Sequence, residues 1–94
     1  MINLLEVNSQ NPLVILRGEY GIIKGENSLI AAPSVKRGSI LILFDEVNKV
    51  SAMAHFDGDC DLQENLDKIF ENLLAKGAKL ENLKYNLITK EENE

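Results

Sequence analysis

The chain has 94 residues, of which 45% are hydrophobic and 27% are charged, and its net charge at neutral pH is −5. This composition is typical of one small globular domain and argues against a chain that is disordered over most of its length. The acidic balance argues against a surface for nucleic acid or for an anionic membrane, because both need clustered Lys and Arg.

The cysteine content and the apolar runs predict a compartment. The single cysteine, Cys60, cannot form a disulfide within one chain, which favours a reducing environment. The longest apolar run, 40–44, is far shorter than the roughly 20 residues of a membrane-spanning helix. No basic segment followed by a long apolar one opens the chain, so a secretory signal is not expected. We therefore expect a cytoplasmic protein without membrane insertion.

Three short β-strands are predicted in the first third of the chain. The apolar run Leu13–Leu16 follows Asn11-Pro12 and is typical of a strand. Residues 20–24 and 28–32 predict two more strands. Between them, Gly25-Glu26-Asn27 predicts the turn of a β-hairpin.

Two longer strands are predicted in the middle of the chain. Residues 40–44 are apolar at every position, which is typical of a strand that is covered on both faces. After a turn over 45–48 the pattern alternates from Val50, so that the even-numbered residues up to Phe56 share one face. The alternation places the one histidine, His55, at a strand end on the opposite face.

An amphipathic helix over about 61–76 follows. Asp61 is a suitable N-cap, and Glu64 completes a capping-box pattern. Gly77 is placed to end the helix in the left-handed conformation. The apolar residues of one helical face are Leu62, Leu66, Ile69, Phe70, Leu73 and Leu74.

A returning strand is expected over about 83–88, and residues 91–94 are expected to form a disordered tail. Several strands, one helix and one returning strand predict an α+β fold with a layered β-sheet, in a single domain over 1–90.

Cys60 is a candidate nucleophile. It stands beside the predicted start of the helix, where the helix dipole lowers the pKa of a thiol. Asp57, Asp59 and Asp61 flank it with negative charge, which raises that pKa. His55 would act as its base only if the loop between them folds back. These residues favour an incidental thiol, and a catalytic Cys60 remains the alternative.

The same aspartates have the spacing that opens a calcium-binding loop. That loop needs Gly at its sixth position and Glu at its twelfth, where this chain has Leu62 and Lys68. One histidine and one cysteine are too few for a zinc site. No glycine-rich phosphate loop is present, so no cofactor or metal is expected.

Several segments, in order along the chain, resemble the CheD family of chemoreceptor glutamine deamidases. They are Gly18-Glu19-Tyr20, Gly38-Ser39 followed by ILILFD, Ala52-Met53-Ala54-His55-Phe56 and Lys76-Gly77-Ala78. The resemblance covers roughly residues 13–88. It implies a CheD-like sheet domain that is truncated relative to the family, whose domain continues with further strands and a helix.

The family's site uses a cysteine nucleophile, a histidine base and a threonine that orients the histidine. The resemblance assigns His55 to the histidine and Ser34 to the threonine, and it puts Ile40 in place of the nucleophile. If it holds, Ile40 and His55 must lie side by side. A branched alkyl group cannot attack an amide carbonyl. The resemblance therefore implies a vestigial site.

Three hypotheses follow. The first is a non-catalytic protein-binding or assembly module, with a link to chemotaxis. The second is an amidohydrolase that deamidates protein glutamine side chains with His55 and a relocated thiol, Cys60. The third is a structural domain without a tie to chemotaxis. Because a truncated sheet leaves strand edges open, we expect a homodimer, or a receptor or signalling protein, to cover them.

Overall fold

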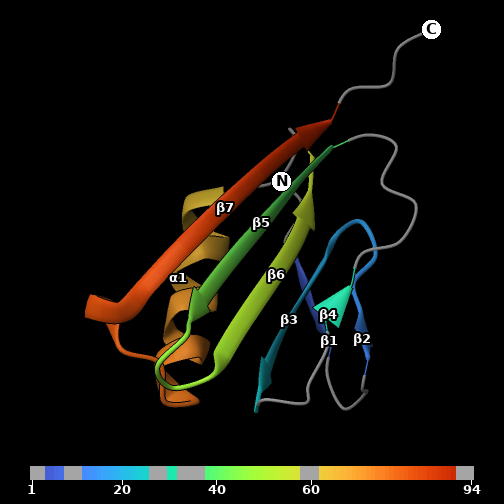
Figure 1. The fold of residues 1–94 in the computed structure, drawn as a ribbon. Helices are drawn as coiled ribbons and strands as arrows, with labels where there is room; N and C mark the ends of the chain where they lie inside the picture. The colour runs from blue at the N-terminus through green and yellow to red at the C-terminus, as the bar shows by residue number, and fades with distance from the viewer. Residues whose placement is uncertain (1–3, 8–11, 26–29, 32–37, 58–61, 91–94) are drawn as a thin grey trace, which may run out of the picture.

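The computed structural model describes residues 4–7, 12–25, 30–31, 38–57 and 62–90. The elements in order are β1 (Leu5–Val7), β2 (Leu13–Val14), β3 (Glu19–Lys24), β4 (Ile30–Ala31), β5 (Gly38–Asp45), β6 (Val50–Phe56), α1 (Leu62–Ala75), a 3₁₀ turn (Leu80–Asn82) and β7 (Leu83–Lys90). This order confirms the predicted α+β class, with strands first, then one helix and a returning strand (Figure 1). Within the described residues, no helix is long and apolar enough to cross a membrane.

The main sheet has five strands in the order β1-β3-β6-β5-β7. Strands β1 and β3 are parallel, and the other neighbours are antiparallel. The helix α1 packs on one face of this sheet, mainly against β6 and β3 (Figure 1). We call the face that carries α1 the helix face, and the opposite one the far face.

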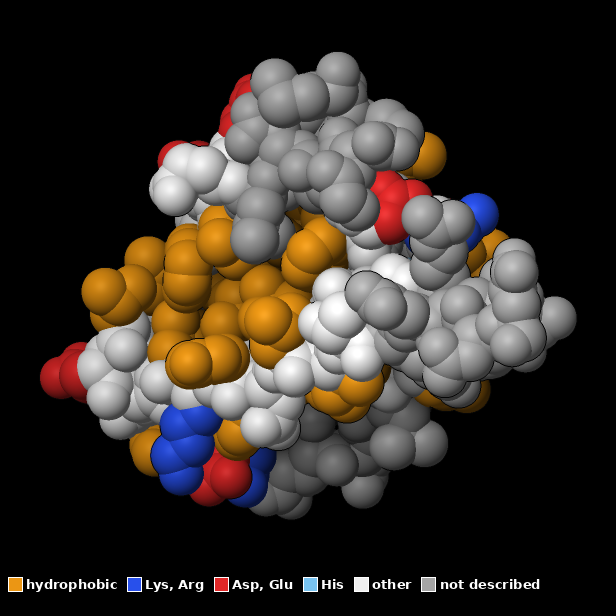
Figure 2. All heavy atoms as spheres, turned by 90° about the horizontal axis from the view of Figure 1, so that it is seen from above, with side chains coloured by type: hydrophobic (Ala, Val, Ile, Leu, Met, Phe, Trp, Pro, Cys, Tyr) orange, Lys and Arg blue, Asp and Glu red, His pale blue; other side chains and the backbone are white. Residues whose placement is uncertain are grey.

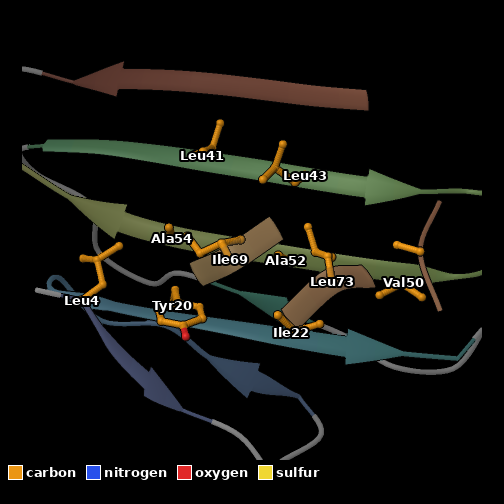
Figure 3. Close-up of a cluster of buried hydrophobic side chains, with 11 residues drawn as sticks. Leu4, Tyr20, Ile22, Leu41, Leu43, Val50, Ala52, Ala54, Ile69 and Leu73 are labelled. Carbon is orange, nitrogen blue, oxygen red and sulfur yellow. The ribbon is translucent and has the colours of Figure 1, made fainter. Parts of the chain in front are cut away.

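The helix face holds the larger core. Its buried side chains include Val50, Ala52 and Ala54 of β6, on the face that the alternation predicts, and Phe56 is partly buried beside them. Ile69 and Leu73 of α1 point toward these side chains (Figure 3). Each such aliphatic side chain contributes roughly 1.5–3 kcal/mol when fully buried. The members of this core are Leu4, Tyr20, Ile22, Leu41, Leu43, Val50, Ala52, Ala54, Ile69, Leu73 and Ala78.

The far face is covered in part by a second, two-stranded sheet. Strands β2 and β4 pair in parallel, and Leu13 on β2 packs into a small cluster on this face. The buried members of the far-face cluster are Leu13, Ile15, Ile40 and Met53. Strand β5 therefore has buried side chains on both faces, as predicted for the apolar run 40–44.

The predicted hairpin over 20–24 and 28–32 is wrong. Strand β3 pairs with β1 on one side and β6 on the other, so neither of its edges is open to β4. The Gly25 N–H instead donates to the Lys49 carbonyl at 2.9 Å, which ties the end of β3 to the turn before β6. Ile30 packs against the far-face cluster, so its burial places β4 beside β2.

The helix ends as predicted. Gly77 has a φ of 107°, its N–H donates to the Leu74 carbonyl at 3.1 Å, and the Ala78 N–H donates to the Leu73 carbonyl at 3.1 Å. These bonds form a Schellman motif, which satisfies carbonyls that the last turn leaves open. The predicted N-cap, Asp61, and the predicted tail, 91–94, lie outside the described residues.

Candidate functional site

His55 lies on the far face, one residue before the end of β6, and only 5% of it is exposed. Its direct partners are Glu19 on β3 and Ile40 on β5. Directly opposed residues of antiparallel strands point to the same face, with their Cβ atoms about 4.5–5.5 Å apart. His55 therefore shares the far face with the side chains of Glu19 and Ile40 on the two neighbouring strands. We call these three residues the His55 cluster.

The predicted juxtaposition of Ile40 and His55 is confirmed by the strand register. Ile40 is 8% exposed and packs in the far-face cluster beside Met53. Position 40 therefore contributes to packing, and its alkyl side chain offers His55 neither a proton nor a nucleophilic atom.

Gly38 lets the start of β5 approach the backbone of Phe56 closely. A Cβ atom at this position would lie 3.5 Å from His55 Nε2 and only 2.8 Å from the Phe56 carbonyl oxygen. Gly38 also has a φ of 107°, a conformation that residues with a side chain rarely adopt. A larger residue here would have to displace the backbone of β6, so the glycine fixes how closely β5 approaches the end of β6.

Glu19 is a site residue that was not predicted from the sequence. Its Oε1 atom accepts a hydrogen bond from the Leu16 N–H at 2.8 Å, which holds the carboxylate at the start of β3. A carboxylate can orient a neighbouring histidine ring by accepting a hydrogen bond from it, whereas Glu19 Oε1 accepts its hydrogen bond from the backbone of Leu16. The alternation in β3 places Tyr20 and Ile22 on the helix face, so the sequence already indicated that the Glu19 side chain lies on the far face. Its position opposite His55 follows only from the β3–β6 pairing.

The remaining predicted site residues, Ser34 and Cys60, lie outside the described residues. Ser39 is next to Ile40 in the sequence, but it pairs with Phe56 and so lies on the helix face. There its hydroxyl is 3.2 Å from that of Thr89. Ser39 therefore does not take the role of nucleophile beside His55.

A polar cluster joins β1, β3 and α1. The Asn72 Nδ2 donates to the Tyr20 hydroxyl at 3.0 Å, and that hydroxyl donates to Glu6 Oε1 at 3.3 Å. Burial raises the pKa of Tyr20, and the negative charge of Glu6 raises it further. The hydroxyl stays protonated at neutral pH and links the three elements.

Asp45 forms a second polar cluster at the other end of β5, where it is 1% exposed. Its carboxylate accepts four hydrogen bonds of 2.7–3.0 Å, from the N–H groups of Val47, Asn48 and Lys79 and from the Asn48 side chain. Burial alone would raise the pKa of Asp45, but these hydrogen bonds outweigh burial and hold the pKa well below its ordinary value. This residue ties the β5–β6 turn to the segment that leads into β7.

The outer edge of β7 is the second candidate site. Tyr85, Leu87 and Ile88 are exposed by 70%, 55% and 54%, and in the described part of the chain no strand pairs with this edge. Tyr85 and Leu87 pair with Leu43 and Leu41, so they lie on the helix face, whereas Ile88 lies on the far face. Figure 2, which views the molecule from above, shows hydrophobic side chains gathered over part of the surface.

No protein-family model, curated protein or solved structure matches the chain. Function is therefore inferred from the His55 cluster and from the β7 edge.

Proposed function

We propose that the protein is a protein-binding or assembly module that adds a strand of a partner to its main sheet at the β7 edge. The observation that carries this proposal is the exposure of Tyr85, Leu87 and Ile88 on a long edge strand. Natural edge strands are protected by being short, charged, bulged or covered. Strand β7 has eight residues and pairs with β5 along its whole length without a bulge, and its two lysines stand near its ends and leave residues 85–89 uncharged.

Addition of a partner strand would use both the open backbone groups of this edge and its exposed side chains. The open backbone groups of an edge strand supply hydrogen bonds to the incoming strand, and alternate side chains supply specificity. Strand β7 has exposed apolar side chains on both faces, so an added strand would cover hydrophobic surface on each. Tyr85 and Leu87 are neighbours on the helix face, and exposed apolar surface that is grouped in this way is typical of interaction sites.

The His55 cluster supports a module without thiol chemistry of the CheD kind. The side chain opposite His55 is the buried hydrocarbon of Ile40. In this proposal the chain is a CheD-like domain that has lost the deamidase reaction and kept a binding role linked to chemotaxis. The pairing of Ile40 with His55, which the resemblance requires, supports that relation.

Site-specific photo-crosslinking tests the binding role. Tyr85→p-benzoylphenylalanine, in cells that naturally express the protein, should give one defined protein adduct on irradiation. The adduct should disappear when Leu87→Lys is added. The same crosslinker at Leu5, which is 67% exposed on the opposite edge strand, is the matched control. Adduct formation from position 85 no greater than from position 5 would contradict the proposal.

The pairing of Glu19 with His55 favours one other function, an amidohydrolase in which His55 activates Cys60. Thiol alkylation as a function of pH separates the two. If the protein is a module, the alkylation of Cys60 should be unchanged by His55→Gln. In a Cys60→Ser, Ile40→Cys double variant, the new thiol should have a pKa below about 8.5 that rises with His55→Gln. A Cys60 pKa that itself depends on His55 would favour the enzyme.

A further inference from the structure

We infer that the strand that occupies the β7 edge is β7 of a second copy of the chain, so that two main sheets join about a two-fold axis. The inference rests on the proposed function, because it names the partner of that surface. Closed two-fold dimers are the commonest assemblies of a chain with itself. Two identical antiparallel strands are symmetric about an axis perpendicular to the sheet, which makes the edge its own complement.

The symmetry and the charges of β7 select one register. Directly opposed residues of antiparallel strands share a face, so each opposed pair has two odd or two even residue numbers. Only the registers centred on Asn86 and on Leu87 overlap nearly the whole strand. Centring on Leu87 would place Lys84 opposite Lys90, and opposed like charges are destabilising. Centring on Asn86 places Lys84 opposite Ile88 instead.

In the register centred on Asn86, apolar side chains of the two copies lie opposite each other on the helix face. Tyr85 of each copy lies opposite Leu87 of the other, and both side chains are more than half exposed in the single chain. Cross-strand pairs of an aromatic and an aliphatic side chain stabilise antiparallel sheets. The symmetry forms this contact twice, so four of the exposed apolar side chains lose contact with water.

The side chains on the far face are also compatible with this register. Asn86 pairs with Ile42 of β5, and Ile42 packs against the far-face cluster. Two Asn86 amides would meet on the axis, and each amide has both donors and an acceptor for the other. The alkyl stem of Lys84 would lie against Ile88, while its ammonium group remains 3.7 Å from Glu46. The two Lys84 residues would be about 14 Å apart along the strands, beyond the screening length at physiological salt.

Disulfide trapping tests both the dimer and its register. In a Cys60→Ser background, Asn86→Cys should form a disulfide-linked dimer under mild oxidation at least tenfold faster than Leu87→Cys or Leu5→Cys. Only residue 86 lies opposite itself in the inferred register, within the Cα–Cα range that a disulfide spans. All three positions are exposed, and circular dichroism melting curves check that the variants fold.

Analytical ultracentrifugation of the unmodified protein gives a second measurement. We expect a dimer whose dissociation constant rises at least tenfold in Leu87→Lys and is unchanged in Leu5→Lys. A monomer at every concentration up to millimolar, or equal disulfide trapping at positions 86 and 5, would overturn the inference. If the isolated protein is monomeric but position 85 still crosslinks to a different protein in cells, the inference fails while the proposed function stands. If neither occurs, both fail.

Discussion

The two edge strands of the main sheet, β1 and β7, differ in how they meet solvent. Strand β1 has three residues, and Leu5 is its one strongly exposed apolar side chain. Strand β7 has eight residues and exposes Tyr85, Leu87 and Ile88. A short strand offers a partner few backbone groups, so β1 is protected by its length. Strand β7 lacks that protection, which makes it the edge that a partner strand can extend.

Both edges are nevertheless held to the molecule in a similar way. The Leu4 N–H, just before β1, donates to Asn65 Oδ1 at 2.9 Å. The Lys79 N–H, ahead of β7, donates to Asp45 Oδ2 at 2.9 Å. Asn65 and Asp45 are each 1% exposed. The edges therefore differ in what they expose rather than in whether a buried polar group anchors them.

The largest loss of stability is expected from Asp45→Ala, which removes the carboxylate that holds the segment leading into β7. Three partly buried backbone N–H groups lose their acceptor, and the Asn48 side chain loses one as well, so several bonds to one charged group are lost together. The urea midpoint should therefore fall further than in Asn65→Ala, which leaves one N–H without its acceptor. Glu46→Ala, whose side chain is 66% exposed in an ion pair with Lys84, is the control and should have little effect. Similar midpoints for Asp45→Ala and Glu46→Ala would show that Asp45 is not the anchor.

The anchor of β7 should also depend on pH. The pKa of Asp45 is lower in the folded protein than in the unfolded chain, because its hydrogen bonds outweigh the effect of burial. Its contribution to stability is therefore complete above the unfolded pKa, about 3.9, and is lost as the pH falls through the folded pKa. Between pH 4 and 2 the urea midpoint of the wild type should fall more steeply than that of Asp45→Asn. An equal pH dependence of the urea midpoint in the two proteins would show that ionised Asp45 does not stabilise the fold.

A smaller loss of stability is expected from Asn65→Ala, which removes the side-chain oxygen that holds the start of β1. The Leu4 N–H loses its acceptor, at a cost of about 1–3 kcal/mol in the free energy of unfolding. Hydrogen exchange should become faster at the amides of β1 and stay unchanged in β7. Gln63→Ala, on the exposed side of α1, is the matched control. Unchanged protection of β1 in Asn65→Ala would show that this bond does not hold the edge.

Local patterns were enough to predict the helix and the two faces of β6. The end of α1 depends on Gly77 and its own last turn, and the faces of β6 depend on a simple alternation. Strand β1 was not predicted, because its three residues carry no such pattern and it forms by pairing with the distant β3. The pairing of His55 with Ile40 was predicted from the resemblance. Glu19 was missed because its place opposite His55 depends on long-range register.

The smallest effect on folding, and the sharpest test of the difference between the edges, comes from Leu87→Lys and Leu5→Lys. Both side chains are more than half exposed, so the stability of the single folded chain should change by no more than about 0.5 kcal/mol in either variant. In a dimer, dissociation is linked to unfolding, so the urea midpoint of the wild type should rise with protein concentration. Leu87→Lys should abolish that rise, because its charge lies on the strand that joins the copies, and Leu5→Lys should keep it. An identical concentration dependence in the two variants would mean that β1 and β7 are equivalent edges, and the case for β7 as the binding edge would be lost.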